Sequence, residues 1–425
     1  MAQPIYWLSQ EKIVNCNKFQ IITTKMTKYL VTGAAGFIGA NFVKYILSKW
    51  GNDIEIVILD DLTYAGNLMT IKDEIELDNV TFIKGDIGNR ELVTDIIAKH
   101  DPHYIVNFAA ESHVDRSITN PRLFLETNIL GTQNLLDCAR NAWLEGKDKN
   151  GKNQYKEGRK FLQISTDEVY GSLAKDYDSA QPLSVSDDVK QVIEGRDNLK
   201  TFGQNFFTEL TPLAPRSPYS AAKTGADLIT LAYHETYGMP INITRCSNNY
   251  GPYHFPEKLI PLIIKNILEG KSLPVYGKGD NVRDWLYVED HAKAIDMVLR
   301  NGKLGEVYNV GGFNEEQNIN IVKTVIAIIA RIMKEEPQYQ SLLKCNIEDI
   351  NNNLITFVAD RPGHDMRYAI DPTKIAVELG WYPETPFSVG IEKTIRWYLD
   401  NQAWVESVTS GDYQQYYQQM YHNRN

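Results

Sequence analysis

One stretch of the chain, Val31-Thr32-Gly33-Ala34-Ala35-Gly36-Phe37-Ile38-Gly39, joins a predicted strand at residues 29–32 to a predicted helix at residues 40–49. Glycines in such a connection permit a tight turn and let the backbone approach an anion at the start of the helix, where unpaired N–H groups and the helix dipole favour negative charge. Alanine is tolerated at the two variable positions. Taken alone this spacing is weak evidence, because ordinary strand-to-helix turns can share it.

The sequence around this stretch alternates short strand-forming runs with helical runs. Further strands are predicted at residues 54–59, 80–83, 104–109 and 161–164. Strands that alternate with helices in this way are typical of parallel sheets. We therefore expect an α/β fold, a Rossmann-type doubly wound parallel sheet with a smaller, discontinuous α/β substrate-binding domain.

The length of the chain and the positions of its Pro and Gly residues suggest the domain boundaries. A chain of 425 residues is too long for one compact lobe. We expect an N-terminal extension at residues 1–26, a nucleotide-binding domain at 27–249 to which about 285–312 return, and a mainly substrate-binding domain at 250–425. Residues 146–160 are predicted to form an exposed loop. A second polar insertion at 172–210 is either functional or mobile, and we favour the mobile interpretation.

Composition excludes several classes of partner. The formal net charge of -10 and the pI near 5.4 argue against binding to nucleic acid or to an anionic membrane. The four cysteines lie far apart and form no C-x-x-C pair, so we expect neither a metal site nor disulfides. We expect no signal peptide, and no uninterrupted apolar run reaches membrane-spanning length. These features together favour the cytoplasm.

Acidic residues follow the second predicted strand. Asp60 and Asp61 stand about twenty residues after the glycine-rich turn, where a carboxylate can accept hydrogen bonds from an adenosine ribose. A carboxylate at this place would repel a 2′-phosphate, so the sequence favours NAD over NADP. Asp86 and Ile87 follow the third strand, and Ala109 and Ala110 lie at the end of the fourth, the edge of the sheet where ligands bind.

Two further pairs of residues are candidates for catalysis. Tyr219 and Lys223 are spaced i and i+4 on a helix that begins at Pro218, so both face one site. A neighbouring ammonium, together with a nicotinamide charge, would lower the pKa of the phenol toward neutrality. Asp167 and Glu168 follow the strand at 161–164, and adjacent acids after a buried strand are costly unless they line a cleft. Their repulsion would raise the pKa of one of them.

From about residue 28 to its C-terminal region the chain resembles the dTDP-glucose 4,6-dehydratases. The shared motifs are the glycine-rich turn, Leu62-Thr63-Tyr64-Ala65-Gly66-Asn67, Ala109-Ala110-Glu111-Ser112-His113-Val114-Asp115-Arg116-Ser117, Thr166-Asp167-Glu168, and the helix from Tyr219 to Lys223.

The resemblance implies a division of roles. Tyr219, assisted by Lys223 and Thr166, would deprotonate the hydroxyl at carbon 4 of the sugar while NAD+ accepts hydride. Glu168 would then remove the proton at carbon 5, and Asp167 would protonate the hydroxyl that leaves carbon 6.

The resemblance also implies ligands for both small molecules. NAD contacts are expected at the glycine-rich turn and the strand ends: Gly33, Gly36, Phe37, Ile38, Gly39, Asp60, Asp61, Leu62, Thr63, Asp86, Ile87, Ala109, Ala110, Glu111, Ser112, Thr127, Tyr219, Lys223 and Asn249. Contacts to dTDP-glucose are expected from His113, Thr166, Asn248, Glu257, Lys258, Leu259, Pro274, Tyr276, Arg283, Asn318, Asp360, Arg361 and His364.

Some of these residues have a second interpretation. Arg283 and Arg361 suit a diphosphate because guanidinium groups bind phosphate oxygens bidentately. Tyr276 could lie against the nucleotide base or simply pack in the interior. For His113 we favour a hydrogen-bonded structural role or a ligand contact over a role as acid or base. Members of the family commonly form homodimers through the helices at about 125–140 and 218–223, and we expect the same here.

Three other functions stay open at this point. The chain could be a 4-epimerase, which would not need the Asp167–Glu168 pair, or a dehydratase of a GDP-, CDP- or UDP-sugar. It could also be a non-catalytic NAD-binding scaffold, because a fold alone does not establish an activity.

Overall fold

A computed structural model describes residues 26–175, 180–182, 199–360 and 363–409. The expectations for residues 1–25, for the middle of the insertion and for Arg361 lie outside this part of the chain.

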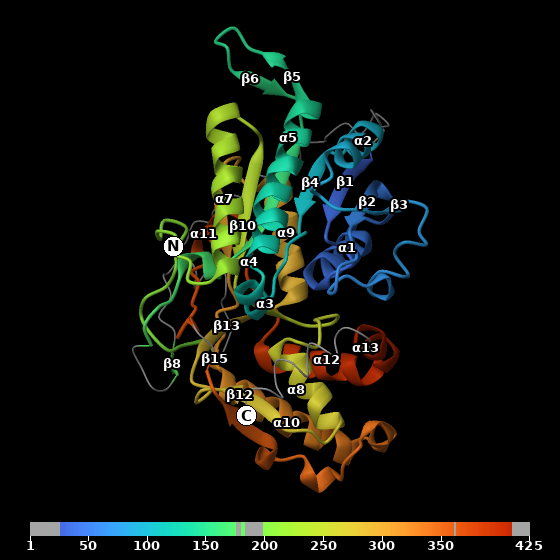
Figure 1. The fold of residues 1–425 in the computed structure, drawn as a ribbon, viewed down its shortest axis with the longest axis vertical. Coiled ribbons are helices and arrows are strands. Elements are labelled where there is room, and N and C mark those ends of the chain that lie inside the picture. The colour runs from blue at the N-terminus through green and yellow to red at the C-terminus, as the bar shows by residue number, and fades with distance from the viewer. Residues whose placement is uncertain (1–25, 176–179, 183–198, 361–362, 410–425) are drawn as a thin grey trace, which may run out of the picture.

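The larger lobe is built on a seven-stranded sheet in which all strands are parallel (Figure 1). Its order is β14-β10-β7-β4-β1-β2-β3, so the chain starts in the middle and winds outward in both directions. The predicted doubly wound Rossmann-type sheet is confirmed. The strands are β1 (Thr27–Thr32), β2 (Ile54–Asp60), β3 (Val80–Lys84), β4 (Tyr104–Asn107), β7 (Lys160–Thr166), β10 (Ile241–Cys246) and β14 (Val307–Val310).

Helices cover both faces of this sheet, which explains why the central strands are buried over nearly their whole length. On one face lie α1 (Phe37–Trp50), α9 (Val288–Asn301) and α11 (Thr373–Leu379). On the other face lie α2 (Arg90–His100), α5 (Thr132–Trp143) and α7 (Pro218–Tyr237). Each face has a hydrophobic core of its own.

Local sequence explains where α7, the helix of the Tyr-Lys pair, begins and ends. Ser217 caps its start by a reciprocal bond with Ser220, and Pro218 occupies the first turn, where no N–H is needed. The helix ends at Gly238, whose φ of 68° is in the left-handed region that glycine accepts without cost.

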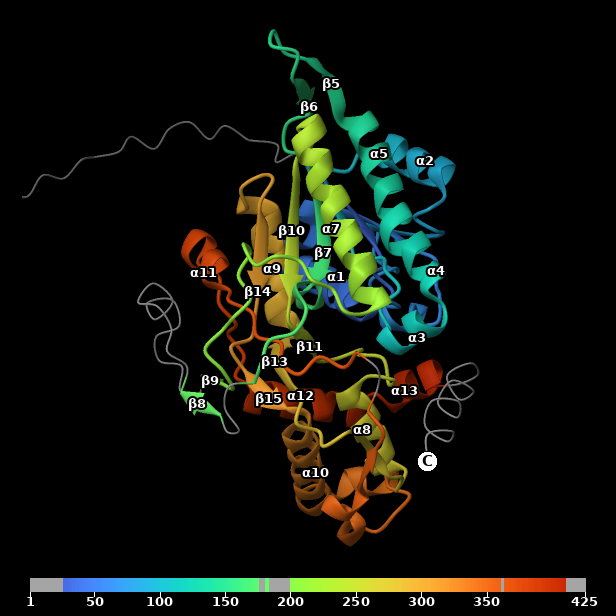
Figure 2. The same cartoon turned by 60° about the vertical axis from the view of Figure 1, so that its left-hand side comes forward.

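Three local expectations were wrong. Helix α1 begins at Phe37, three residues earlier than predicted, because the chain turns into the helix directly at Gly36. Strand β4 ends at Asn107, since the next residues leave the sheet toward the glycine-rich turn. Residues 146–160 are not simply a loop: β5 (Leu144–Lys147) and β6 (Asn153–Tyr155) form a hairpin that projects beyond α5 and α7 (Figure 2). The carboxylate of Asp148 fixes its turn by accepting two backbone N–H groups.

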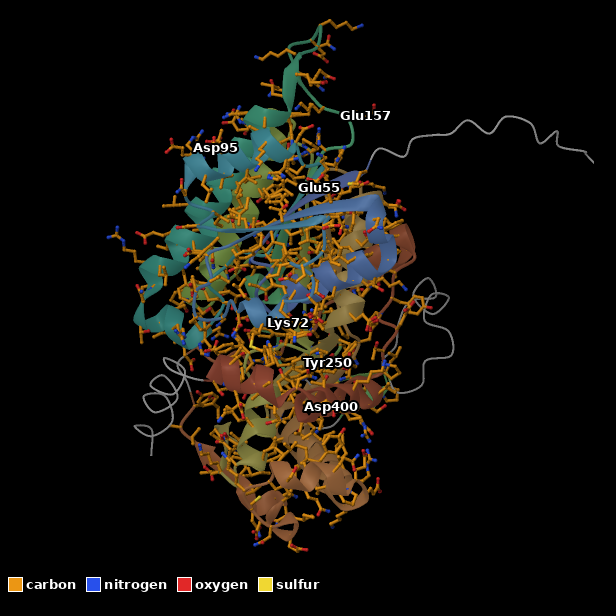
Figure 3. All side chains as sticks on the ribbon, turned by 90° about the vertical axis from the view of Figure 1, so that its right-hand side faces the viewer. Glu55, Lys72, Asp95, Glu157, Tyr250 and Asp400 are labelled. Carbon is orange, nitrogen blue, oxygen red and sulfur yellow. The ribbon has the colours of Figure 1, made fainter. Side chains whose placement is uncertain are left out.

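The smaller lobe comes mainly from the last third of the chain and encloses a separate core rich in isoleucine and aromatic residues. Tyr250 belongs to this core and lies where the two lobes meet (Figure 3). The elements of this lobe are β11 (Asn248–Tyr250), α8 (Leu259–Leu268), β12 (Leu273–Tyr276), β13 (Val282–Tyr287), β15 (Glu315–Gln317), α10 (Asn318–Glu335), β16 (Ile355–Val358), α12 (Phe387–Asp400) and α13 (Gln402–Thr409).

Four shorter elements lie outside these two groups: α3 (Val114–Thr119), α4 (Pro121–Leu125), β8 (Gln181–Pro182) and β9 (Lys200–Thr201). Among the described residues, no helix combines the length and the apolar character needed to cross a membrane.

Candidate active site

A cavity of about 450 Å³ opens at the carboxyl ends of the central strands, between the two lobes. The structure brings most of the predicted site residues together on its wall. Those are Gly33, Gly36, Phe37, Ile38, Gly39, Asp60, Asp61, Thr63, Asp86, Ile87, Ala109, Ala110, Glu111, Ser112, Thr127, Thr166, Asp167, Glu168, Tyr219, Lys223, Asn248, Asn249, Glu257, Lys258 and Leu259.

The glycine-rich turn is a close-packed cradle at one end of this cavity. Gly33 has a φ of 70°, and a Cβ there would lie 2.6 Å from the backbone nitrogen of Ala109. A Cβ on Gly39 would lie 2.6 Å from the carbonyl oxygen of Gly33. Helix α1 starts at the cavity with no side-chain cap and no acidic residue in its first turn. This geometry fits the pyrophosphate of a dinucleotide, because the positive end of the helix faces the space unobstructed.

The two carboxylates after β2 differ in their surroundings. Asp60 is buried and accepts hydrogen bonds of 2.8 Å from the backbone nitrogens of Ala35 and Leu62, so it braces the glycine-rich turn. Asp61 is exposed and lines the cavity. Of the pair, Asp61 is therefore the residue placed to receive a ribose hydroxyl.

The Thr-Asp-Glu run forms a tight turn directly after β7. The hydroxyl of Thr166 accepts the backbone N–H of Glu168 at 3.3 Å and lies 3.3 Å from the carboxylate of Asp167. The same hydroxyl is hydrogen-bonded to the phenol of Tyr219. The Nζ of Lys223 donates to the carbonyl of Ile164 at 2.6 Å. Five residues from two distant segments thus meet around the end of one strand.

Burial dominates the electrostatics of this group. The side chain of Asp167 is 1% exposed, and burial, followed by the charges of Glu168 and Asp284, raises its pKa well above the usual value, while Arg283 opposes the shift. For Asp167, burial is a larger cause of the raised pKa than the repulsion from Glu168.

The expected effect on Tyr219 was not found. Burial, and after it the charge of Glu168, raises the pKa of Tyr219 well above its usual value, and the hydrogen bond from Thr166 only partly opposes this. Burial lowers the pKa of Lys223. Within the chain itself, the desolvation of the phenol outweighs the influence of the neighbouring ammonium.

Polar residues of the cavity wall, among them Glu257 and Lys258, are held by hydrogen bonds and ion pairs with their neighbours. The buried carboxylate of Glu257 accepts from the Tyr64 hydroxyl at 3.1 Å and lies 3.7 Å from Arg116. Lys258 donates to the carbonyl of Ser112 at 3.3 Å. The Nδ1 of His113 accepts the backbone N–H of Arg116 at 3.4 Å, which makes His113 the cap of α3.

Several predicted substrate contacts lie apart from this cavity. Tyr276 on β12 donates to Asp115 at 3.3 Å, and its ring is edge-on to His364 at 6.1 Å. His364 in turn pairs with Asp360 at 2.6 Å. The other predicted residues outside the cavity wall are Leu62, His113, Pro274, Arg283 and Asn318.

Arg283 in particular is buried, with bonds to the carbonyls of Val282 at 2.7 Å and Asp365 at 2.9 Å. Its guanidinium group lies 4.2 Å above the ring of Tyr368, and its charge lowers the pKa of Asp167. The sequence alone suggested a diphosphate ligand there.

The cavity wall also contains residues that the sequence did not single out, among them Cys246, Ser247, His254, Phe255 and Trp285. The ring of His254 stacks on Phe37 with centroids 4.2 Å apart, and burial lowers its pKa to about 3. This contact joins residues more than 200 positions apart, so no spacing rule could have indicated it. In the described part of the chain no three His, Cys, Asp or Glu side chains cluster as metal ligands would.

Comparisons with known proteins agree with this geometry. The model of the NAD dependent epimerase/dehydratase family matches residues 29–311. The chain is 47% identical over 401 residues to the dTDP-glucose 4,6-dehydratase of Shigella flexneri, which covers 93% of this chain and 99% of that protein. It is 46% identical over 389 residues to the dTDP-glucose 4,6-dehydratase of Xanthomonas campestris, at 91% and 97% coverage.

Solved structures give the same result. The dTDP-glucose 4,6-dehydratase of Bacillus anthracis in complex with NAD is 41% identical, with a TM-score of 0.71 and 90% and 99% of the two chains covered. UDP-glucose 4-epimerase from Thermotoga maritima matches with a TM-score of 0.68 at 22% identity over 88% and 100% of the chains, which indicates a shared fold alone.

Proposed function

The chain belongs to the NAD dependent epimerase/dehydratase family and, within it, to the dTDP-glucose 4,6-dehydratases, and we propose that the residues around the end of β7 carry out its reaction. The enzyme converts dTDP-glucose into dTDP-4-keto-6-deoxyglucose and water. The observation that carries the proposal is the buried Asp167 beside Glu168 on the wall that also bears Tyr219 and Lys223.

Bound NAD+ supplies a reversible hydride acceptor, so that hydride removed from carbon 4 can be returned at carbon 6 and no cosubstrate is consumed. The fit of the cofactor rests on the glycine cradle and the uncapped start of α1. We propose that Asp61 receives the adenosine ribose and that the remaining predicted contacts on the cavity wall complete the site.

Tyr219 takes the proton from the hydroxyl at carbon 4. Thr166 is placed to receive that hydroxyl and Tyr219 together, because its side chain already bonds to the phenol. Lys223 holds a positive charge at the end of β7, which stabilises the phenolate that a base must form. The raised pKa of Tyr219 means that this stabilisation is needed in the reacting complex.

The acid pair then performs the elimination. Once carbon 4 is a ketone, the proton on carbon 5 is acidic, and Glu168 removes it as the base. Asp167 remains protonated because it is buried next to another carboxylate, so it can donate a proton to the hydroxyl that leaves carbon 6. An epimerase has no use for this pair.

We further propose that the small lobe recognises the nucleotide. Pro274 and Tyr276, with His364 and Asp360, form a cluster suited to an aromatic base, and Lys258 lies between this lobe and the cavity. The dTDP-glucose 4,6-dehydratase from Streptomyces venezuelae, 38% identical over 90% of this chain, has a solved structure with NAD and TYD bound. Residues 27–249 with 285–312 would bind the cofactor, and 250–425 would bind mainly the sugar nucleotide.

The same helices that surround Tyr219 support a homodimer. Leu125 at the end of α4, Leu130 between α4 and α5, and Leu228 on α7 are 46%, 59% and 53% exposed, an unusual display of large apolar side chains. We propose that a second copy covers them. The free thiols of the three described cysteines are consistent with the cytoplasm as the enzyme's location.

The test is to incubate the purified protein with dTDP-glucose, UDP-glucose or GDP-mannose without added reduced cofactor, and to measure product mass. Loss of one water from dTDP-glucose alone, abolished by Glu168→Gln, is the expected result. A product of unchanged mass indicates epimerisation, and no product from any substrate indicates a scaffold.

A further inference from the structure

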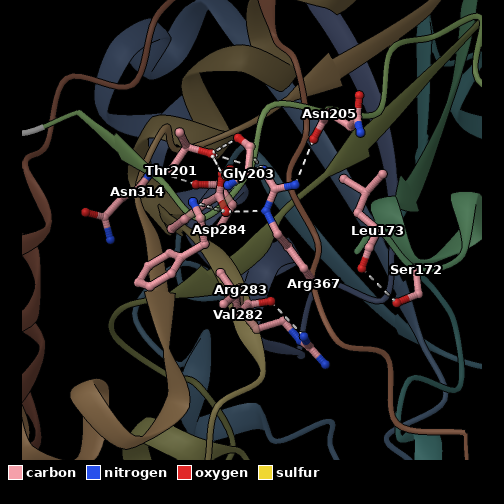
Figure 4. A network of polar contacts seen from close by, with 12 residues as sticks. Ser172, Leu173, Thr201, Gly203, Asn205, Val282, Arg283, Asp284, Asn314 and Arg367 are labelled. Atoms are coloured by element: carbon pink, nitrogen blue, oxygen red, sulfur yellow. Dashed lines mark hydrogen bonds and ion pairs between the residues drawn. The ribbon is translucent and has the colours of Figure 1, made fainter. Parts of the chain in front are cut away.

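Arg367 and Glu315 form a fully buried ion pair in the last third of the chain. The side chain of Arg367 is 0% exposed, and its guanidinium group donates to the two carboxylate oxygens of Glu315 at 2.6 and 2.8 Å. Glu315, on β15, is 2% exposed. Figure 4 shows Arg367 at the centre of a polar network that extends well beyond this pair.

The same guanidinium group binds the far end of the insertion. It donates to the carbonyl of Asn205 at 2.8 Å, to the hydroxyl of Thr201 at 3.1 Å and to the carbonyl of Gly203 at 3.3 Å. Thr201 completes the arrangement by donating to Glu315 at 2.6 Å. The hydrogen bonds of the Arg367 guanidinium group therefore anchor the described part of the insertion beyond residue 199. Because the group is buried, water does not compete for these bonds.

The near end of the insertion converges on the same place. The backbone nitrogen of Leu173 donates to the carbonyl of Arg367 at 3.0 Å, and that of Met366 donates to the hydroxyl of Ser172 at 3.0 Å. Both described ends of the insertion, which starts directly after the Thr-Asp-Glu turn, are thus fixed to one residue. They support this part of the site, contrary to the interpretation of the whole insertion as a mobile loop.

Asp365 and Tyr368, which lie close to Arg367 in the sequence, both contact Arg283. The carbonyl of Asp365 accepts from Arg283 at 2.9 Å, and the guanidinium of Arg283 lies 4.2 Å above the ring of Tyr368. The charge of Arg283 acts on Asp167, and that of Glu168 acts on Tyr368. Residues 365–368 therefore join the Arg367 network to Arg283.

We propose that Arg367 is a positioning residue for the elimination: with Glu315 it locks residues 365–368 in place, and the Asp365 carbonyl and the Tyr368 ring in turn hold Arg283. The inference rests on the proposed function, because it assigns a role within that reaction. Arg367 itself lies outside the cavity wall and touches no reacting atom.

The conservative variant Arg367→Lys separates this role from mere charge. Lysine keeps a positive charge beside Glu315, but its three donors cannot reproduce a planar fork that reaches one carboxylate, two carbonyls and a hydroxyl. Residues 365–368 would then shift, and Arg283 would move away from Asp167. Displacements of about 1 Å far from the chemistry can cost on the order of a hundredfold in rate.

A change in pH dependence is the more specific sign. Asp167 must be protonated to act, and Arg283 is the neighbour that lowers its pKa. Withdrawing that charge raises the pKa of the acid pair, so the alkaline limb of kcat moves to higher pH. The groups that face Asp167 and stay in place are Thr166, Glu168, Tyr219, Cys246 and Asp284.

The experiment measures kcat, KM, the pH profile of kcat and thermal stability with dTDP-glucose for the wild type, Arg367→Lys, Glu315→Gln and Arg159→Lys. Arg159 is a matched control, because its buried guanidinium bonds to Asp101 at 2.7 and 2.9 Å near the opposite end of the sheet.

For Arg367→Lys and Glu315→Gln we expect kcat to fall by about ten- to a hundredfold, KM to change by less than about threefold, and the alkaline limb to rise by roughly half a pH unit. Arg159→Lys should lose stability with an unchanged profile. If the Arg367 variant retains the wild-type limb, the positioning role is wrong, whatever its stability. If the wild type itself does not dehydrate dTDP-glucose, the proposed function fails instead.

Discussion

The Nζ of Lys223 donates a 2.6 Å hydrogen bond to the carbonyl oxygen of Ile164, two residues before Thr166, where the strand ends and the acids follow. This bond fixes helix α7 to the end of β7. Because the ammonium group is held by backbone, its position relative to Thr166 and Asp167 does not depend on a flexible side-chain partner. The residues proposed for oxidation, on α7, and those proposed for elimination, after β7, are therefore held in a fixed relative position.

Replacing the base of the elimination should stop turnover without unfolding the enzyme. For Glu168→Gln we expect kcat to fall by at least about a hundredfold, because general acid–base groups contribute factors of this order. Product mass and circular dichroism measured together check this. Glu157→Gln, in the exposed turn that follows the projecting hairpin, should keep wild-type activity; a normal rate in the Glu168 variant contradicts the assigned role.

A methyl group at Gly33 should damage both stability and cofactor binding. The new Cβ would approach the Ala109 backbone to 2.6 Å at a positive φ, and overpacking of this kind costs about 1–3 kcal/mol beyond the backbone strain. Gly51 also has a positive φ but has open space around it. Urea unfolding and NAD titration of Gly33→Ala and Gly51→Ala separate strain from collision, and equal losses in the two variants would contradict this account.

The buried pair of Arg245 and Asp227 should be more sensitive than an exposed one. Its atoms are 2.8 Å apart with side chains 3% and 0% exposed. Removing one charge leaves the other buried, so Asp227→Asn should lower the free energy of unfolding by about 3–5 kcal/mol. Glu306→Gln, which breaks the partly exposed pair with Lys374, should cost about 1 kcal/mol or less. Chemical denaturation distinguishes the two.

Burial of His291 makes stability depend on pH in a definite direction. Its Nδ1 donates to the Asn249 side chain at 2.9 Å, and burial lowers its pKa to about 3 from 6.5. Below pH 6.5 the unfolded chain takes up a proton that the folded ring refuses, so stability is lost as the pH falls from 6.5 toward 3.

His291→Asn keeps a donor for Asn249 but cannot titrate. Relative to the wild type, the variant should gain about 2 kcal/mol between pH 7 and pH 5. Denaturation curves at the two pH values measure this difference. If the curves of the two proteins shift in parallel, His291 is not the source.

The sequence by itself determined the parts of this protein that follow from local rules. The Gly33 turn predicts a dinucleotide cradle because only glycine allows the required φ and close approach, and the spacing of Tyr219 and Lys223 places both on one helix face. The adjacent acids are identifiable because no ordinary buried turn can hold them cheaply.

Only the tertiary structure decided which residues share an environment. Asp60 and Asp61 are neighbours in sequence and both line the cavity, yet Asp60 is buried and braces the turn, whereas Asp61 is exposed. The sequence predicts Arg283 as a phosphate ligand, and the fold adds its bond to the Asp365 carbonyl, while Arg367 makes contacts with residues more than 50 positions away. Desolvation and long-range hydrogen bonds depend on the packed chain, and therefore no local pattern encodes them.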